Sequence, residues 1–183
     1  EKSTFSEFKD KITELQSSGM SKMIIDLRDN PGGVLDEACN MADMILPEGI
    51  ITYTETKSGK RTDYNSDAES LDIPIVILIN ENSASASEVF TGALKDYGKA
   101  TVVGKKSYGK GIVQSVLPFY DGSGMSLTVA KYYTPNGTCI HGIGIEPDVE
   151  VDMPDEYKDM YASMVEHDKD TQLQKAIEII KEK

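Results

Sequence analysis

Short, nearly continuous apolar runs alternate along this chain with segments whose apolar residues recur every three or four positions. Runs of the first kind are typical of buried strands, because each is brief and ends in turn-forming residues; they span 23–27, 75–79 and 101–103. Segments of the second kind predict amphipathic helices; they span 4–18, 34–45 and 86–97. Strands that alternate with helices predict an α/β fold with parallel strand pairing.

Two further stretches predict hairpins, and the C-terminal part predicts helix. A polar, β-rich stretch turns at 57–60, and paired strands are expected at 112–117 and 125–133, around a turn at 121–124. Residues 155–182 are expected to be helical, with a break near 168–170. A length of 183 residues suits one domain spanning 1–183.

The charge balance excludes two classes of partner. Acidic residues outnumber basic ones by 31 to 19, and a net charge of -12 repels both nucleic acid and anionic membrane surfaces. Cys39 and Cys139 match no metal-ligand spacing and are too few for a disulfide framework. No signal peptide or membrane-spanning run is present, and the start at Glu1 leads us to expect a piece of a longer protein.

Catalytic groups of α/β folds favour loops that follow strands, and one such loop is rich in serine. Residues 83–88 place several hydroxyls between a predicted strand and a predicted helix, where free N–H groups and the helix dipole favour a nucleophile. Small alanine neighbours leave space for a substrate backbone. The alternative is structural, because Ser85 and Glu88 also have the spacing of a helix capping box.

A nucleophilic serine needs a base. Neither of the two histidines, His141 and His167, directly follows a predicted strand as the serine-rich loop does, so a Ser-His-Asp triad has little support, although His141 stays open. Lysine serves as base if burial leaves its amine neutral. Lys110 is a candidate, because Gly109 and Gly111 allow its loop to pack closely against an apolar surface; the alternative is an ordinary solvated lysine.

Backbone N–H groups could stabilise an oxyanion beside this serine. Gly32 or Gly33 would supply one donor and Ala86, the residue after the candidate nucleophile, another. The alternative for the Pro-Gly-Gly segment is a plain tight turn.

Three ordered motifs resemble those of the C-terminal processing, or tail-specific, peptidases. They are Asp26-Leu27-Arg28-Asp29-Asn30-Pro31-Gly32-Gly33, Asn82-Ser83-Ala84-Ser85-Ala86-Ser87-Glu88 and Tyr108-Gly109-Lys110-Gly111-Ile112-Val113-Gln114. The resemblance continues through 131–137 and 144–149 and so covers nearly the whole chain.

The resemblance implies that Ser85 is the nucleophile, that Lys110 is the base and that Gln114 orients the lysine. It also implies a superhelical fold of sheet and helices related to ClpP and crotonase, substrates that are proteins or peptides with apolar C-terminal tails, and an extracytoplasmic location; it allows a homo-oligomer. No cofactor is expected. The family usually carries a PDZ domain upstream, which these residues lack, as they lack the strand that normally precedes the first helix.

Two rival functions share this fold. One is a catalytically silent core that binds a peptide or another ligand, and the intact Ser85, Lys110 and Gln114 argue against it. The other is a crotonase-type acyl-CoA enzyme with a two-amide oxyanion hole. Such an enzyme must bind the anionic nucleotide of coenzyme A, which fits the negative net charge of this chain and its Ser–Lys pair less well.

Overall fold

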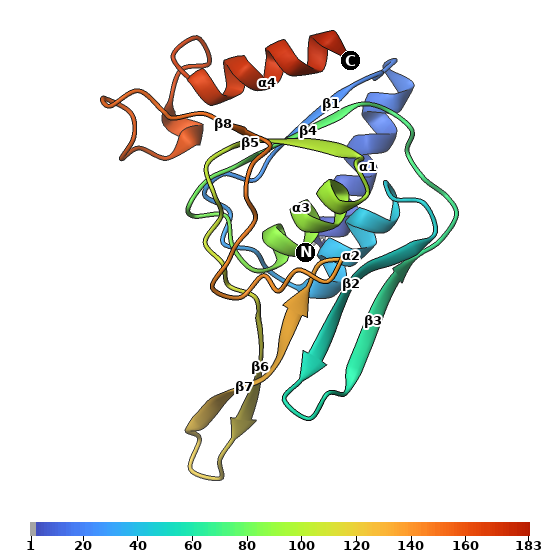
Figure 1. Ribbon diagram of the computed structural model, residues 1–183, viewed down its shortest axis with the longest axis vertical. Coiled ribbons are helices and arrows are strands. Elements are labelled where there is room, and N and C mark those ends of the chain that lie inside the picture. The colour runs from blue at the N-terminus through green and yellow to red at the C-terminus, as the bar shows by residue number, and fades with distance from the viewer. Residues whose placement is uncertain (1–2) are drawn as a thin grey trace.

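A parallel sheet of four strands lies at the centre of the chain, of which the computed structural model describes residues 3–183 (Figure 1). The strand order is β1-β4-β5-β8, and all three neighbouring pairs are parallel. The strands are β1 (Met23–Asp26), β4 (Ile75–Ile79), β5 (Ala100–Gly104) and β8 (Val149–Glu150). The expected α/β fold is confirmed, and the sequence pattern missed only β8, because two residues are too few to show a period.

The central strand β4 faces helices on both sides. All five of its residues are buried, as its continuous apolar run predicted. Ile75, Ile77 and Ile79 belong to the cluster that includes α1 (Thr4–Ser17), α2 (Leu35–Asp43) and α3 (Ala86–Asp96). Val76 and Leu78 face the other way, toward α4 (Thr171–Glu182). The strand alternation therefore produces a helix–sheet–helix layering, with α4 on one side of the sheet and α1, α2 and α3 on the other (Figure 1).

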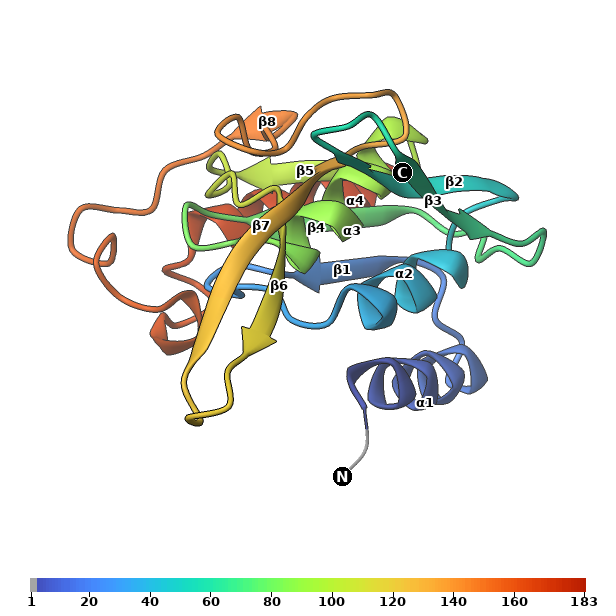
Figure 2. The ribbon, with the colours of Figure 1, turned by 90° about the horizontal axis from the view of Figure 1, so that it is seen from below.

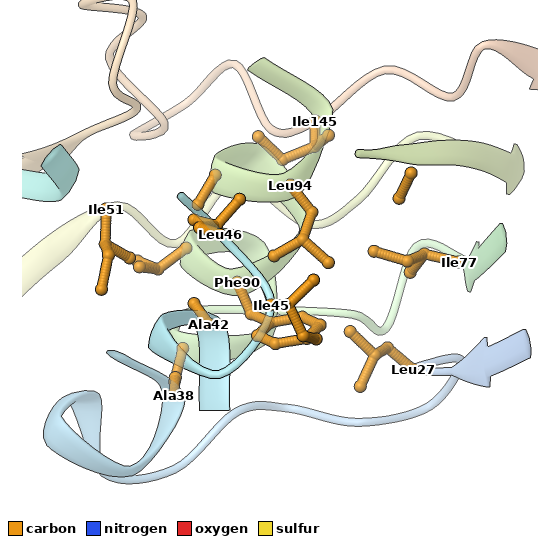
Figure 3. Close-up of a cluster of buried hydrophobic side chains, with 14 of the residues drawn as sticks. Leu27, Ala38, Ala42, Ile45, Leu46, Ile51, Ile77, Phe90, Leu94 and Ile145 are labelled. Atoms are coloured by element: carbon orange, nitrogen blue, oxygen red, sulfur yellow. The ribbon is translucent and has the colours of Figure 1, made fainter. Parts of the chain in front are cut away.

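The larger core cluster joins the first half of the chain to α3 (Figure 3). Phe90 of α3 packs with Ile45, which follows α2, and with Ile77 of β4, and each of the three is at least 98% buried. Burying a side chain of this size contributes about 1.5 to 3 kcal/mol. The helix that begins at Ser85 is therefore held rigidly.

A second sheet, of antiparallel strands, extends from this core. Its order is β3-β2-β7-β6, with the strands β3 (Arg61–Ser66), β2 (Gly49–Thr56), β7 (Gly124–Tyr133) and β6 (Ile112–Pro118). Both predicted hairpins are confirmed. The β6–β7 hairpin projects away from the helices in both ribbon views (Figures 1 and 2).

The C-terminal prediction was partly wrong. Residues 155–170 form turns and one short 3-10 helix, Ala162–Met164, and only Thr171–Glu182 is an α-helix. Segment 155–170 has few buried side chains to reward helix formation. Asp170 starts α4 by accepting a hydrogen bond from the N–H of Leu173, as a helix cap does.

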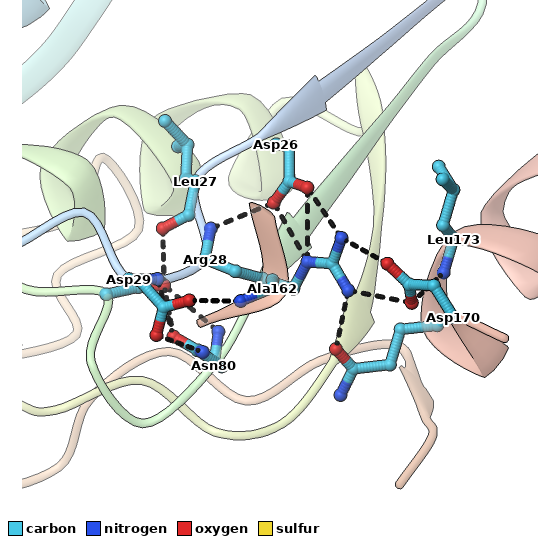
Figure 4. A network of polar contacts seen from close by, with 10 residues as sticks. Asp26, Leu27, Arg28, Asp29, Asn80, Ala162, Asp170 and Leu173 are labelled. Carbon is cyan, nitrogen blue, oxygen red and sulfur yellow. Dashed lines mark hydrogen bonds and ion pairs between the residues drawn. The ribbon is translucent and has the colours of Figure 1, made fainter. Parts of the chain in front are cut away.

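A buried charge network attaches this C-terminal part to the end of β1 (Figure 4). The Arg28 guanidinium, of which 2% is exposed, bonds Asp170 at 2.7 and 2.9 Å and Asp26 at 2.6 Å. Its Nη1 also donates to Gln172 Oε1. The turn after β1 is thereby clamped to the start of α4.

Candidate active site

Three loops meet at one edge of the parallel sheet because they follow the neighbouring strands β1, β4 and β5. The Ser83 hydroxyl donates to the carbonyl of Leu27 at 2.7 Å, and the Ala84 N–H donates to the carbonyl of Asn30. The Tyr108 N–H donates to the carbonyl of Ser83. The structure thus joins the three loops that the sequence singled out.

Ser85 stands at the start of α3 in an unusual backbone conformation. Its φ is 57° and its ψ is -118°; besides Asp29, it is the only non-glycine residue with positive φ in the described part of the chain. Such conformations cost about 1 to 3 kcal/mol and cluster at active sites. Of the predicted capping box, the bond from the Ser85 N–H to the Glu88 carboxylate is present at 2.8 Å, while the Glu88 N–H donates to the backbone carbonyl of Ser85. The Ser85 hydroxyl makes no capping bond and is left available.

The other two serines of the loop have structural surroundings. Ser83 is fully buried and its hydroxyl is committed to the carbonyl of Leu27. Ser87 is buried within the first turn of α3. Ser85 alone among the three is partly exposed, so it is the one that a substrate can reach.

A single buried carboxylate connects the serine loop to the lysine loop. Glu88 is 1% exposed, and its Oε2 accepts the N–H groups of Ser85 and Lys110, each at 2.8 Å. Its Oε1 accepts the Ser107 hydroxyl and the Gly109 N–H, each at 2.6 Å. The amides of Ser85 and Lys110 are therefore within two hydrogen-bond lengths of each other.

The backbone of the lysine loop is closely packed. Gly109 and Gly111 are buried, and a side chain at Gly111 would collide with the backbone of Ile140 and His141. The Gly142 N–H donates to the carbonyl of Gly109, and the Ile145 N–H to the Ser107 hydroxyl. The flanking glycines thus allow the close packing that the sequence predicted.

The Lys110 side chain itself is exposed, contrary to the burial that we expected from its flanks. The glycines pack through their backbone, which turns the side chain between them outward. Lys105 is paired with Glu150 and Asp152, and Lys106 with Glu146. Lys110 has no ion pair in the described part of the chain, so it is the lysine of this loop that is uncommitted.

The candidate oxyanion donors differ in availability. The N–H of Gly32 donates to the Asn30 side chain at 3.0 Å and is therefore occupied. A Cβ at Gly32, whose φ is +89°, would lie 2.5 Å from the carbonyl oxygen of Ala84 and 2.7 Å from the nitrogen of Ala86. Gly32 therefore provides room for the Ser85 loop. The amides of Gly33 and Ala86 donate no hydrogen bond to residues 3–183, which makes them the better candidates.

Gln114 and the histidines are less closely placed. Gln114 is exposed on β6, and no hydrogen bond joins it to Lys110 in the described residues. His141 and His167 are both exposed, and only His141 lies in a segment that packs on the lysine loop, beside Gly111.

A pocket opens beside the serine loop, and it is lined by Ala86 and Ser87 but not by Ser85 itself. Its volume is about 120 Å³, comparable with an engineered cavity of about 150 Å³ that holds benzene. Its apolar lining comprises Leu27, Val34, Ala38, Met41, Ala86 and Phe90. Gly32 and Gly33 also line it, so the pocket and the free amides adjoin.

The sequence did not predict what Glu88 does. Its spacing from Ser85 indicated a helix cap, which is one of its four bonds. The sequence held no signal for the other three bonds, because Glu88 lies on the side of the predicted helix opposite Val89, Phe90, Ala93 and Leu94.

These features together are those of a serine peptidase site. A serine stands at a strained strand-to-helix junction, its loop is tied to a lysine loop, and free amides and an apolar pocket lie beside it. Comparison with known proteins agrees. The model of peptidase family S41 matches residues 1–151, and the chain belongs to this family.

Relatives and solved structures give the same family. A protein of Staphylococcus aureus strain COL described as "Probable CtpA-like serine protease" is 49% identical over 82% of this chain, and its counterpart in Staphylococcus epidermidis is 46% identical over the same share. The chain spans about a third of their length, 31% and 32%.

Among solved structures, a photosystem II D1 C-terminal processing protease has a TM-score of 0.74 and 38% identity, and the match covers 81% of this chain and 40% of that one. The tricorn protease has a TM-score of 0.54 and 20% identity, and the match covers 88% of this chain and 15% of that one. At this identity it supports the fold alone. The ClpP-like fold class expected from the resemblance is confirmed.

Proposed function

We propose that this chain is the catalytic core of a serine endopeptidase that hydrolyses peptide bonds near the C-termini of protein substrates, with Ser85 as nucleophile and Lys110 as general base. The observation that carries this proposal is the Glu88 carboxylate, which holds the amides of both residues on one oxygen atom. A shared anchor keeps a nucleophile and its base in register.

The chemistry is acyl transfer in two steps. The neutral amine of Lys110 takes the hydroxyl proton of Ser85 while the serine oxygen attacks the peptide carbonyl. The amides of Ala86 and Gly33 stabilise the oxyanion, and the protonated lysine returns its proton to the departing amine. Water then attacks the acyl-enzyme with Lys110 again as base, which releases the acid and regenerates Ser85.

Desolvation of Lys110 must come from the substrate or from further parts of the protein, because its side chain is exposed here. An approaching polypeptide excludes water from the amine and so favours its neutral form. Gln114 then orients the amine from strand β6, a role that requires its side chain to reach the lysine in the complex.

The pocket beside the serine loop suits an aliphatic side chain of the substrate, in keeping with apolar C-terminal tails. We propose an extracytoplasmic location on the basis of the family. None of the helices in residues 3–183 combines the length and the apolarity that crossing a membrane requires.

A fluorophosphonate probe tests the nucleophile, because it needs an activated serine and no extended substrate. Mass spectrometry should find the label on Ser85, and Ser85→Ala should abolish both labelling and the cleavage of a peptide. Ser87→Ala is the matched control, two residues further along the chain, and should keep the label. A label on another residue would show that the assignment is wrong.

The second candidate is a core that binds polypeptide without cleaving it, and the exposure of Lys110 favours it. It predicts peptide binding with no labelling of Ser85 under any condition. A crotonase-type acyl-CoA enzyme likewise predicts no label.

A further inference from the structure

Within residues 3–183, strand β6 has a strand partner on one side only. It is the outer strand of the order β3-β2-β7-β6. Proteins normally protect such an edge with charged residues or proline. Residues 112–117 contain neither, and Pro118 stands only at the far end. Val116 is 71% exposed and Leu117 43%. An uncharged, unprotected edge of this kind is suited to accept another strand.

The hydrogen bonds at the two ends of β6 identify the groups that point outward. The carbonyl of Gly111 accepts from Tyr132, and the Phe119 N–H donates to the carbonyl of Ser123, so residues 111 and 119 face β7. Alternation then directs the N–H and C=O groups of residues 112, 114 and 116 away from β7. The register shift near Val113 places its extra residue in β7 and leaves this alternation intact.

The free edge begins at the candidate active site. β6 starts two residues after Lys110, whose amide shares the Glu88 oxygen with the amide of Ser85. At about 3.3 Å per residue, the edge extends roughly 20 Å from Lys110 to Val116. A strand laid along it would lead directly to the nucleophile.

We infer that the outer edge of β6 binds the substrate polypeptide as an added strand and delivers its scissile bond to Ser85; this inference rests on the proposed function. The occupant is an extended, unfolded segment of the substrate. Main-chain bonds to residues 112, 114 and 116 would recognise it whatever its sequence, and the pocket beside the serine loop would select one side chain.

A proline substitution tests the edge without breaking the hairpin. Val116→Pro removes the N–H group that points away from β7 and leaves the hydrogen bonds to β7 in place. The native Pro118 has the same orientation, so a proline at such a position is compatible with the hairpin. The control Val116→Ala removes side chain but keeps the donor. Both variants are made in the Ser85→Ala chain, and the probe is a fluorescein-labelled peptide of about ten residues composed of alanine, valine, serine and lysine. Val116→Pro should lower the affinity for this peptide about fivefold or more, whereas Val116→Ala should not.

Two readouts complete the test. Thermal unfolding should be similar for the two variants at position 116, and peptide binding should slow amide exchange at Gln114 and Val116 in the Ser85→Ala chain. Equal affinities for the proline and alanine variants, or no added protection, would overturn the inference. So would sedimentation that shows a dimer broken by Val116→Pro, because a second copy would then occupy the edge.

Failure of this inference is distinguishable from failure of the proposed function. Val116→Pro in the otherwise unchanged chain should leave fluorophosphonate labelling of Ser85 at its normal rate, because the probe does not contact β6. Loss of labelling in the unsubstituted chain would refute the peptidase chemistry, whatever β6 binds.

Discussion

Glu88 illustrates at the scale of one residue how a buried charge organises a site. Its two oxygens accept four bonds, two from the lysine-loop amides, one from Ser107 and one from Ser85. A carboxylate can accept all four, whereas a carboxamide has one acceptor oxygen and two donors of its own. The charge on this side chain is therefore a structural requirement.

Glu88→Gln should leave at least two buried donors unpaired. We expect the free energy of unfolding, measured in urea, to fall by about 2 to 4 kcal/mol. The fluorophosphonate labelling of Ser85 should also be slower, even at urea concentrations well below the unfolding midpoint, where the variant is folded. The control is Glu37→Gln, because within residues 3–183 Glu37 accepts one bond, from the N–H of Phe5, and glutamine can still accept it. Unchanged stability and labelling in Glu88→Gln would contradict this account.

Lys110→Arg should be as inactive as Lys110→Ala in peptide cleavage. The guanidinium of arginine stays protonated at any working pH and cannot accept the serine proton. Lys106→Ala is the nearby control and should stay active, as should His141→Ala, which tests the remaining alternative base. An active arginine variant would exclude lysine as the base, and an inactive His141→Ala would reopen the histidine alternative.

At the scale of elements, the Arg28 clamp holds α4 against the parallel sheet (Figure 4). Asp170→Asn keeps the cap of α4, since asparagine caps helices as well as aspartate does, and removes the buried charge from Arg28. We expect a loss of about 3 kcal/mol in the free energy of unfolding and faster proteolysis within α4. The control is Asp168→Asn, at an exposed side chain two residues earlier, which should alter the free energy of unfolding by no more than about 0.5 kcal/mol.

Asp29 joins three segments and gives the fold a pH dependence. Burial raises the pKa of this carboxyl, but hydrogen bonds from Asn82, the Ala162 backbone and Asn80 outweigh it, and the pKa is lowered from 3.8. Its contribution to stability is therefore fully present above pH 3.8 and is lost as the pH falls through the folded-state pKa.

Asp29→Asn should remove this contribution. Asparagine tolerates the positive φ of 59°, so the backbone is not strained. The difference in free energy of unfolding between the parent chain and this variant should be largest near neutral pH and should shrink below pH 3.8. A difference that stays constant down to pH 2 would show that the charge of Asp29 is not responsible.

At the scale of the whole molecule, the chain spans about a third of its relatives. If the recognition of C-terminal tails requires parts of the protein outside these 183 residues, the fluorophosphonate probe should still label Ser85, but the chain alone should cleave unfolded proteins slowly and with no preference for their C-terminal residues. Mass spectrometry of the products measures the preference. Fast cleavage selective for one C-terminal sequence would place tail recognition within this chain.

The sequence by itself determined the elements and the candidate residues. Period and turn residues predicted the helices, both hairpins and three of the four parallel strands, because these depend on neighbours a few positions apart. The order of motifs was sufficient to indicate Ser85 and Lys110. The C-terminal segment 155–170 was the exception, since helical propensity without a buried face does not make a helix.

Only the tertiary structure decided how these residues act on one another. Glu88 bonds residues up to 22 positions away. The exposure of Lys110 and the free edge of β6 likewise follow from the packing of loops and sheets. Such contacts join segments distant in the chain, and their geometry depends on side chains filling the core, which no local pattern records.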